Sequence, residues 1–235
     1  MSIRRLTACA FGAGLLWIGM PAVAAPPPAF IASYSVSQGG QALGVAKVSL
    51  RAAGDGSWLY TRDVQGTGGL AAVLGASVSE RSTLRWKGDV PEALSYDYTM
   101  QTAIKSKQRR LRVDWAAGQV SVDEGKGASS YAAQPGLVER NTLALAVGLA
   151  LRDGKQQIAL PVAVRQEVQT QNFKVTGKET IKVPADRFDA ERVDRTDADR
   201  GFSAWYAPDR YPLPVKLSQH DGGNLMLELV SYRAN

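Results

Sequence analysis

The chain has 235 residues, of which 45% are hydrophobic and 21% charged, and its formal net charge is +6. A charge this mild, without a recognised nucleic-acid-binding module, excludes nucleic acid as the expected partner, while it favours contact with anionic lipid, lipopolysaccharide or glycan. The single cysteine is Cys9 and the single histidine is His220. An intramolecular disulfide, a zinc-cysteine site and any site that needs two imidazoles are therefore excluded.

Residues 1–24 have the pattern of a cleavable signal peptide. Arg4 and Arg5 lie near the start of the segment, and a mostly apolar stretch covers residues 6–20. Ala22-Val23-Ala24 then forms an A-x-A cleavage site. The apolar stretch is shorter than the roughly 20 residues that a membrane-spanning helix needs. Cys9 ends a formal lipoprotein box, but the apolar stretch follows this cysteine, so lipidation is the lesser alternative. We expect cleavage near Ala24, export to the periplasm, and a mature chain without a transmembrane helix.

From Phe30 onward the chain predicts short antiparallel strands. Residues 25–29 contain three prolines and predict an extended spacer. After them, runs of alternating apolar and polar residues are separated by turns rich in glycine and aspartate, which is typical of hairpins. The glycine-rich segment 66–75 lacks the spacing of a phosphate-binding loop, and it predicts a flexible connection or a short helix at a barrel mouth. Further strands are predicted at residues 77–86, 93–104, 108–115 and 119–122.

One segment, about residues 137–152, predicts a helix. It is rich in alanine and leucine without strand alternation, and Asp153-Gly154 follow a basic last turn. Its apolar residues nearly encircle it, so we expect it to be buried. Strand patterns then return at residues 157–160, 162–170, 173–183, 187–195, 201–206, 214–219 and 225–232. The predicted fold is mainly β: residues 30–235 form a single domain, an antiparallel β-barrel-like or spiral sheet with this one buried helix.

A basic cluster is the first candidate binding site. Lys105, Lys107 and Arg109 alternate along a predicted strand and therefore share one face of it. Such a face fits an anionic ligand or membrane headgroups, and the alternative is a solvated hairpin end.

Trp205 is the second candidate. In its predicted strand Phe202, Ala204 and Tyr206 occupy one face, and Ser203 and Trp205 occupy the other. We predict that Trp205 plugs the barrel beneath the helix, in which case Trp205→Ala costs about 3–5 kcal/mol. The alternative is an exposed platform that contacts a ligand.

No motif in the chain names a reaction. None of the serines lies in a G-x-S-x-G motif, and His220 stands beside a predicted hairpin turn, without neighbours that support a catalytic triad. The carboxylates of residues 186–199 alternate with arginines and predict cross-strand ion pairs on a solvated face rather than a catalytic pair. We therefore predict no catalytic residue, no metal site and no cofactor.

Several motifs carry a resemblance to a known family. They are VTGKETIKVPA at 175–185, Phe188-Asp189-Ala190, Arg195, AWYAPD at 204–209, LPVK at 213–216, and in the first half Tyr34, Gly39, Gly44, Glu80-Arg81-Ser82, Pro91 and Tyr96. With these motifs the chain resembles domain-of-unknown-function family 3108, which comprises exported proteins of Gram-negative bacteria. Many members have glycine where this chain has Asp186. The resemblance implies a barrel-like envelope protein, loosely similar to periplasmic lipoprotein carriers, and it assigns no catalytic residue.

Three functions remain open at this stage. The first is a non-enzymatic periplasmic binding or envelope-maintenance protein whose ligand, such as lipid, lipopolysaccharide or another envelope component, is amphipathic or apolar. The second is a module that docks on another envelope protein and has no internal cavity. The third, ranked last, is a hydrolase that uses carboxylates alone, which requires two acids converging in a cleft with one in an apolar setting.

Overall fold

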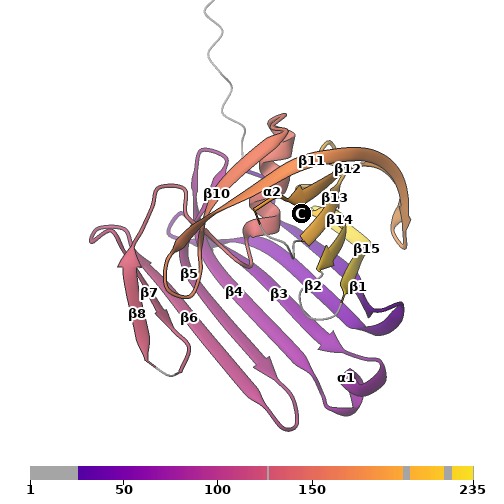
Figure 1. The fold of residues 1–235 in the computed structure, drawn as a ribbon, viewed down its shortest axis with the longest axis horizontal. Coiled ribbons are helices and arrows are strands. Elements are labelled where there is room, and N and C mark those ends of the chain that lie inside the picture. The colour runs from indigo at the N-terminus through magenta and orange to yellow at the C-terminus, as the bar shows by residue number, and fades with distance from the viewer. Residues whose placement is uncertain (1–25, 126, 198–201, 220–223, 235) are drawn as a thin grey trace, which may run out of the picture.

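The computed structural model describes residues 26–125, 127–197, 202–219 and 224–234. The predicted signal peptide, with Cys9, and His220 lie outside the described residues. The described chain forms one continuous, strongly curled sheet of fifteen strands with helix α2 (Leu143–Arg152) inside the curl (Figure 1). The expected mainly β, barrel-like architecture is confirmed.

The strands follow one another around the sheet in two series. The first series contains β1 (Phe30–Gln38), β2 (Gln41–Gly54), β3 (Ser57–Gly66), β4 (Ser77–Lys87), β5 (Val90–Gln101), β6 (Ser106–Asp114), β7 (Gln119–Asp123) and β8 (Ala128–Ala132). The second contains β9 (Val138–Glu139), β10 (Gln157–Ala163), β11 (Val168–Val183), β12 (Asp186–Arg195), β13 (Phe202–Tyr206), β14 (Pro214–Gln219) and β15 (Leu225–Ala234). The first and last strands pair with each other, which joins the two series, and every pairing is antiparallel except that of β9 with β10.

Alternation along the strands decides which side of the sheet is the core. In β1 the side chains of Phe30, Ala32, Tyr34 and Val36 are buried, while the residues between them are more exposed. Successive side chains of a strand point to opposite faces, so this pattern buries one face along the whole strand. The inward faces of both series thus make a continuous apolar interior.

Polar contacts hold the two ends of the sheet near each other. The Tyr131 hydroxyl of β8 donates to the carbonyl of Val164 at 2.5 Å, and the Ser129 hydroxyl donates to the carbonyl of Arg165 at 2.8 Å. Glu124, which follows β7, forms ion pairs with both Arg109 and Arg165. The turn after β10 is therefore bound to the β6–β8 end of the sheet, which curls the sheet towards closure.

Helix α2 begins six residues later than the predicted start at 137. Residues 137–139 join the sheet instead, since the amide of Ala93 donates to the carbonyl of Leu137 at 2.8 Å and Val138 pairs with Val162. The alanine- and leucine-rich composition predicted the helix correctly. Composition alone does not show that the apolar residues before it, 137–139, pair with strands distant in sequence. As expected for an apolar helix, seven of its ten residues, from Leu145 to Leu151, are buried.

Two other boundaries differ from the expectation. The predicted strand 162–170 is interrupted, because β10 ends at Ala163 and a turn leads into β11, where Val164 N donates to the carbonyl of Glu167 at 3.0 Å. Strand β8 was not predicted, because its serine-rich sequence shows no clear apolar alternation. The glycine-rich segment forms the short helix α1 (Gly69–Val73), one of the two alternatives expected for it.

Tyr206, not Trp205, fills the barrel beneath α2. Tyr206 is 0% exposed, and its hydroxyl donates to the carbonyl of Ala144 in the helix at 3.0 Å. The division of β13 into two faces is as predicted, but the assignment of Trp205 to the core is wrong. Its ring is half-buried on the outer face, between the cations of Arg192 and Lys216 at 5.5 and 5.0 Å from the ring centroid. Alternation identifies two faces without showing which one meets the helix.

Candidate functional site

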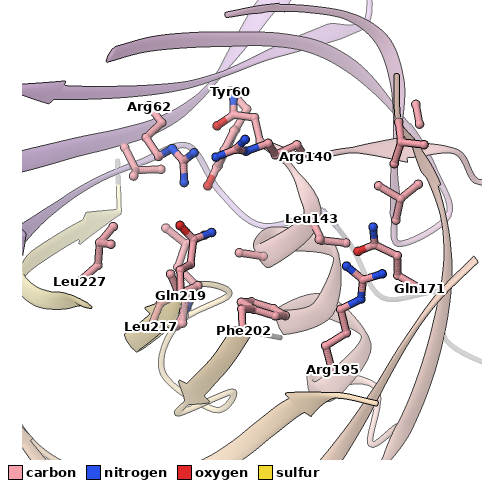
Figure 2. Close-up of a pocket in the computed structure, with 18 of the residues that line it drawn as sticks. Tyr60, Arg62, Arg140, Leu143, Gln171, Arg195, Phe202, Leu217, Gln219 and Leu227 are labelled. Atoms are coloured by element: carbon pink, nitrogen blue, oxygen red, sulfur yellow. The ribbon is translucent and has the colours of Figure 1, made fainter. Parts of the chain in front are cut away.

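A cavity of about 470 Å³ occupies the part of the barrel interior that α2 and Tyr206 leave unfilled. Its walls come from β2 and β3, from the start of α2, from β10, and from β13 to β15 (Figure 2). Ligand pockets of small molecules span roughly 300–1,000 Å³, so the cavity has the size of a ligand site. The second of the three functions expected no cavity, and this volume weighs against it.

One wall of the cavity is mainly apolar. Figure 2 shows Phe202, Leu217 and Leu227 along it, contributed by the adjacent strands β13, β14 and β15, with Leu143 of α2 nearby and the amide of Gln219 beside Leu217. These residues share the inward face because neighbouring strands of an antiparallel sheet keep their alternation in register, as the pairing of Leu217 with Leu227 shows. The wall suits an aliphatic group.

The remaining lining is strongly basic. Five arginines take part: Arg62, Arg109, Arg140, Arg165 and Arg195. No aspartate or glutamate is among the described residues that line the cavity. Isolated charges are costly to remove from water, so a cavity with this lining favours either water or a negatively charged occupant.

Arg62 is held from behind by a buried carboxylate. Its guanidinium forms an ion pair with Glu80, whose second oxygen accepts a hydrogen bond of 2.6 Å from the Tyr96 hydroxyl. Burial by itself would raise the pKa of the Glu80 carboxyl, but Arg62 and the Tyr96 hydroxyl hold this pKa below its ordinary value. Glu80 therefore stays ionised and fixes Arg62 with its cationic head at the cavity wall.

A second buried glutamate shapes the turn that carries Arg140. The Glu139 carboxylate accepts hydrogen bonds from the backbone amides of Asn141 and Thr142 at 2.7 and 3.1 Å, and from the Ser82 hydroxyl at 2.7 Å. Desolvation is the largest influence on Glu139 and raises its pKa. These bonds fix the backbone between β9 and α2, so that Arg140 and Asn141 reach the cavity.

Three polar groups on this side of the cavity lack a protein partner. The guanidinium of Arg140 and the hydroxyl of Tyr60 form no hydrogen bond or ion pair with any residue that the structure describes, and both lie on the wall opposite Phe202 and Leu217 (Figure 2). The Oδ1 atom of Asn141 is buried and likewise without a partner. Of the three, only the Asn141 atom is fully buried; the Arg140 side chain is solvent-exposed, and its charge helps Arg62 to lower the pKa of Glu80. These groups leave hydrogen-bonding capacity on this side of the cavity.

The other three cavity arginines, Arg109, Arg165 and Arg195, lie where the strands end, at the open end of the barrel. The register places Arg195 at the end of β12, the turn that contains Arg165 after β10, and Arg109 near the start of β6, all at the same edge. Each is paired with a carboxylate: Arg109 and Arg165 with Glu124, and Arg195 with Asp197. These arginines form a partly neutralised rim, whereas Arg140, which is solvent-exposed, forms no ion pair with a described residue.

The structure brings one of the predicted site residues into the cavity. Arg109 lines it, whereas Lys105 and Lys107 are exposed at the turn between β5 and β6. Trp205 lies outside it on the outer face, where its Nε1 donates to Glu179 at 2.7 Å. Among the acids of β12, Glu191 forms the expected cross-strand ion pair with Lys178 of β11, whereas Asp194 pairs with Arg192 of its own strand.

Sequence reasoning did not single out Arg62 and Arg140, which are far apart in the chain and marked by no local motif. Arg195 entered only through the family resemblance. The available signal was weak: Glu139-Arg140 is a charged pair in an otherwise apolar segment that was predicted to be helical. Within the described ranges no group of three or more histidine, cysteine or acidic residues is arranged to hold a metal, and no helix there is long and apolar enough to cross a membrane.

Comparisons with known proteins support the fold. A sequence profile of the family described as "Protein of unknown function (DUF3108)" matches residues 33–230. A solved structure, a beta-barrel-like protein of domain-of-unknown-function DUF1849 from Brucella abortus, is similar over 90% of this chain and 100% of that chain, with a TM-score of 0.57 and 8% identity. A DUF1089 family protein from Pseudomonas aeruginosa aligns over 75% of this chain and 89% of its own, with a TM-score of 0.34 and 11% identity. None of the curated proteins compared with the chain is a significant match.

Proposed function

The chain belongs to the DUF3108 family, and from this premise we propose that it is a non-enzymatic binding protein of the periplasm, which holds an anionic amphipathic molecule in the arginine-lined cavity. The observation that carries the proposal is the contrast between the two walls. One wall presents aliphatic and aromatic side chains, and the other presents Arg62 and the unpartnered Arg140 without a lining carboxylate. An amphipathic anion matches both walls at once.

The unpartnered groups narrow the class of head group. Arg140 and the Tyr60 hydroxyl are hydrogen-bond donors, which suit a phosphate or carboxylate oxygen, and charge-assisted hydrogen bonds of this kind are stronger than neutral ones. A lipid-derived acid or phosphate ester meets this demand.

The expected compartment supplies such molecules. With the predicted signal peptide of residues 1–24, we expect the mature chain to work in the envelope, between two membranes rich in anionic lipids. Carboxylate-based hydrolysis remains the last-ranked alternative. Among the described acids, Glu80 and Glu139 are at most 1% exposed and are engaged by Arg62 and by backbone amides, so neither is free to meet a substrate.

The test is ligand binding with a matched series of amphiphiles. Protein purified from the periplasm is titrated with a long-chain fatty acid, the lysophosphatidic acid of the same chain length, and the corresponding fatty alcohol, and native mass spectrometry reports any molecule that co-purifies. We expect both acids to bind at least tenfold more tightly than the alcohol, since a hydrogen bond to a charged group contributes about 1.5–3 kcal/mol.

Two arginine variants make the test specific. Arg140→Gln should weaken binding of the acids about tenfold and leave the alcohol unaffected, whereas Arg81→Gln, which removes an exposed arginine of β4 that does not line the cavity, should change nothing. A protein that co-purifies with no ligand and binds none of the three amphiphiles would refute the proposal. Equal affinity for the acids and the alcohol would refute the proposal that the ligand is anionic.

A further inference from the structure

An apolar tip projects from the edge of the sheet at α1. Leu70 and Val73 of α1 are 70% and 80% exposed, and Ile104 in the neighbouring β5–β6 turn is 84% exposed. The two turns are linked, because the amide of Ala103 donates to the carbonyl of Leu74 at 2.8 Å. Figure 1 shows α1 and this turn together at the lower edge of the sheet.

The large apolar side chains of the tip are exposed, although the backbone of this segment is bound to the start of β2. None of the five residues of α1 is buried. The other large apolar residues that are exposed among those described, Ile31, Val45 and Val230, are only 37–51% exposed and lie on the strands themselves. Exposed apolar groups gathered at one point indicate an interaction surface rather than an accident of folding.

The surroundings of the tip are basic. Residues 98–113 contain Lys105, Lys107, Arg109, Arg110 and Arg112 and no acidic residue, and residues 64–79 contain no charge at all. Arg109 and Arg112 are paired with Glu124 and Asp97. The ammonium groups of Lys105 and Lys107, which are nearest to Ile104 in sequence, form no ion pair with a described residue. Apolar side chains flanked by free lysines match the interface of an anionic bilayer.

We propose that this tip docks the protein on the surface of an anionic phospholipid bilayer. Leu70, Val73 and Ile104 enter the boundary between head groups and acyl chains, while Lys105 and Lys107 remain at the level of the phosphates. The register places the cavity rim at the same edge of the sheet as the tip. The docking inference depends on the tip alone and holds whether or not the cavity contains a ligand.

Co-sedimentation with vesicles tests the inference. Protein from the periplasm, with its mass confirming loss of residues 1–24, is mixed with vesicles of phosphatidylethanolamine and phosphatidylglycerol or with vesicles of phosphatidylcholine alone. We expect binding to the anionic vesicles that weakens with added salt. The triple variant Leu70→Ser, Val73→Ser, Ile104→Ser should lose at least tenfold in affinity. Lys105→Gln with Lys107→Gln should lose about thirtyfold, since each lysine near such a surface contributes roughly fivefold.

Two matched controls exclude general effects of surface polarity and charge. The variant Ile31→Ser, Val45→Ser, Val230→Ser removes exposed apolar side chains away from the tip, and Lys174→Gln with Lys182→Gln removes two exposed lysines of β11. Both should sediment like the wild type, and so should Arg140→Gln, whose defect concerns the cavity.

Several outcomes overturn the docking inference. They are a wild type that remains in the supernatant, tip variants that sediment normally, and controls that lose as much as the tip variants. Capture of an envelope protein that the tip variants no longer bind, without vesicle binding, would assign the tip to a protein partner instead. Binding of soluble amphiphiles by a protein that ignores vesicles would overturn docking and leave the proposed function standing.

Discussion

Tyr206 and Trp205 are neighbours in β13, and their opposite positions predict opposite consequences of truncation. Tyr206 is 0% exposed beneath α2, so Tyr206→Ala should destabilise the protein by about 3–5 kcal/mol through the cavity it leaves. Tyr206→Phe removes only the 3.0 Å hydrogen bond to the carbonyl of Ala144 and should cost about 1 kcal/mol. Trp205→Ala should cost about 1–2 kcal/mol, because the ring is half-buried and its two cation–π contacts contribute about 0.5–1 kcal/mol each.

Urea unfolding followed by far-UV circular dichroism measures these differences. The order of midpoints should be wild type, Tyr206→Phe, Trp205→Ala and Tyr206→Ala, with unchanged slopes if unfolding remains two-state. If Tyr206→Ala unfolds too readily to purify, the size of the Trp205→Ala loss still distinguishes the roles, since a ring beneath the helix would cost about 3–5 kcal/mol and not about 1–2. A loss of 3 kcal/mol or more for Trp205→Ala, with Tyr206→Ala close to wild type, would refute the placement of Tyr206 as the ring beneath the helix.

Two further predictions concern the segment around α2. A Cβ at Gly148 would lie 2.1 Å from the carbonyl oxygen of Pro212, so Gly148→Ala should destabilise the protein by about 1–3 kcal/mol, although alanine has the better helix propensity. The control is Gly177→Ala, because the space around Gly177 is open. It should change stability by less than about 0.5 kcal/mol in the same urea assay. Because the pKa of Glu139 is raised in the folded state, its contribution to stability decreases as the pH rises above the ordinary value of 4.5. The stability of the wild type relative to Glu139→Gln should therefore decline with rising pH, and a pH-independent difference would contradict the raised pKa.

Strands were the most predictable part of the fold because their signal is local. Alternating apolar residues and glycine-containing turns placed most strands of both series within a few residues, and the family resemblance rests on the β11–β12 hairpin and on β13–β14. At the turn between β11 and β12 Val183 pairs with Asp186, and Asp186 Oδ1 accepts a hydrogen bond from the backbone amide of Arg187 at 2.8 Å.

The start of α2 and the identity of the core ring were not predictable from local pattern. Leu137 and Val138 are as apolar as the helix that follows, and only their pairing with β5 and β10 removes them from it. Tyr206 and Trp205 are both large aromatic residues with a polar atom, and the choice between them depends on which face of β13 the helix covers. Both outcomes depend on contacts between residues distant in sequence, such as Leu137 with Ala93 and Tyr206 with Ala144.

The cavity was not predicted either, because its lining residues are also brought together by contacts that are distant in sequence. Arg62, Arg140 and Arg195 belong to three separate elements, and each one alone looks like an ordinary solvated arginine. They converge because the sheet is continuous and curls until its second series faces its first. Only the basic cluster near residue 105 was visible as a motif, and it contributes Arg109 to the cavity rim and its two lysines to the tip.

The charged residues that line the cavity explain why the interior of the barrel is only partly filled by side chains. Under α2 the barrel is filled by Tyr206 and by aliphatic side chains, which gain stability when water leaves. On the other side, collapse would bring Arg62 and Arg140 together with no lining carboxylate to neutralise both, because Glu80 is already committed to Arg62. Removing unpaired charges from water costs far more than the apolar wall gains by closing. The cationic lining therefore opposes collapse of the cavity, and the anionic amphiphile that we propose would allow both walls to be desolvated together.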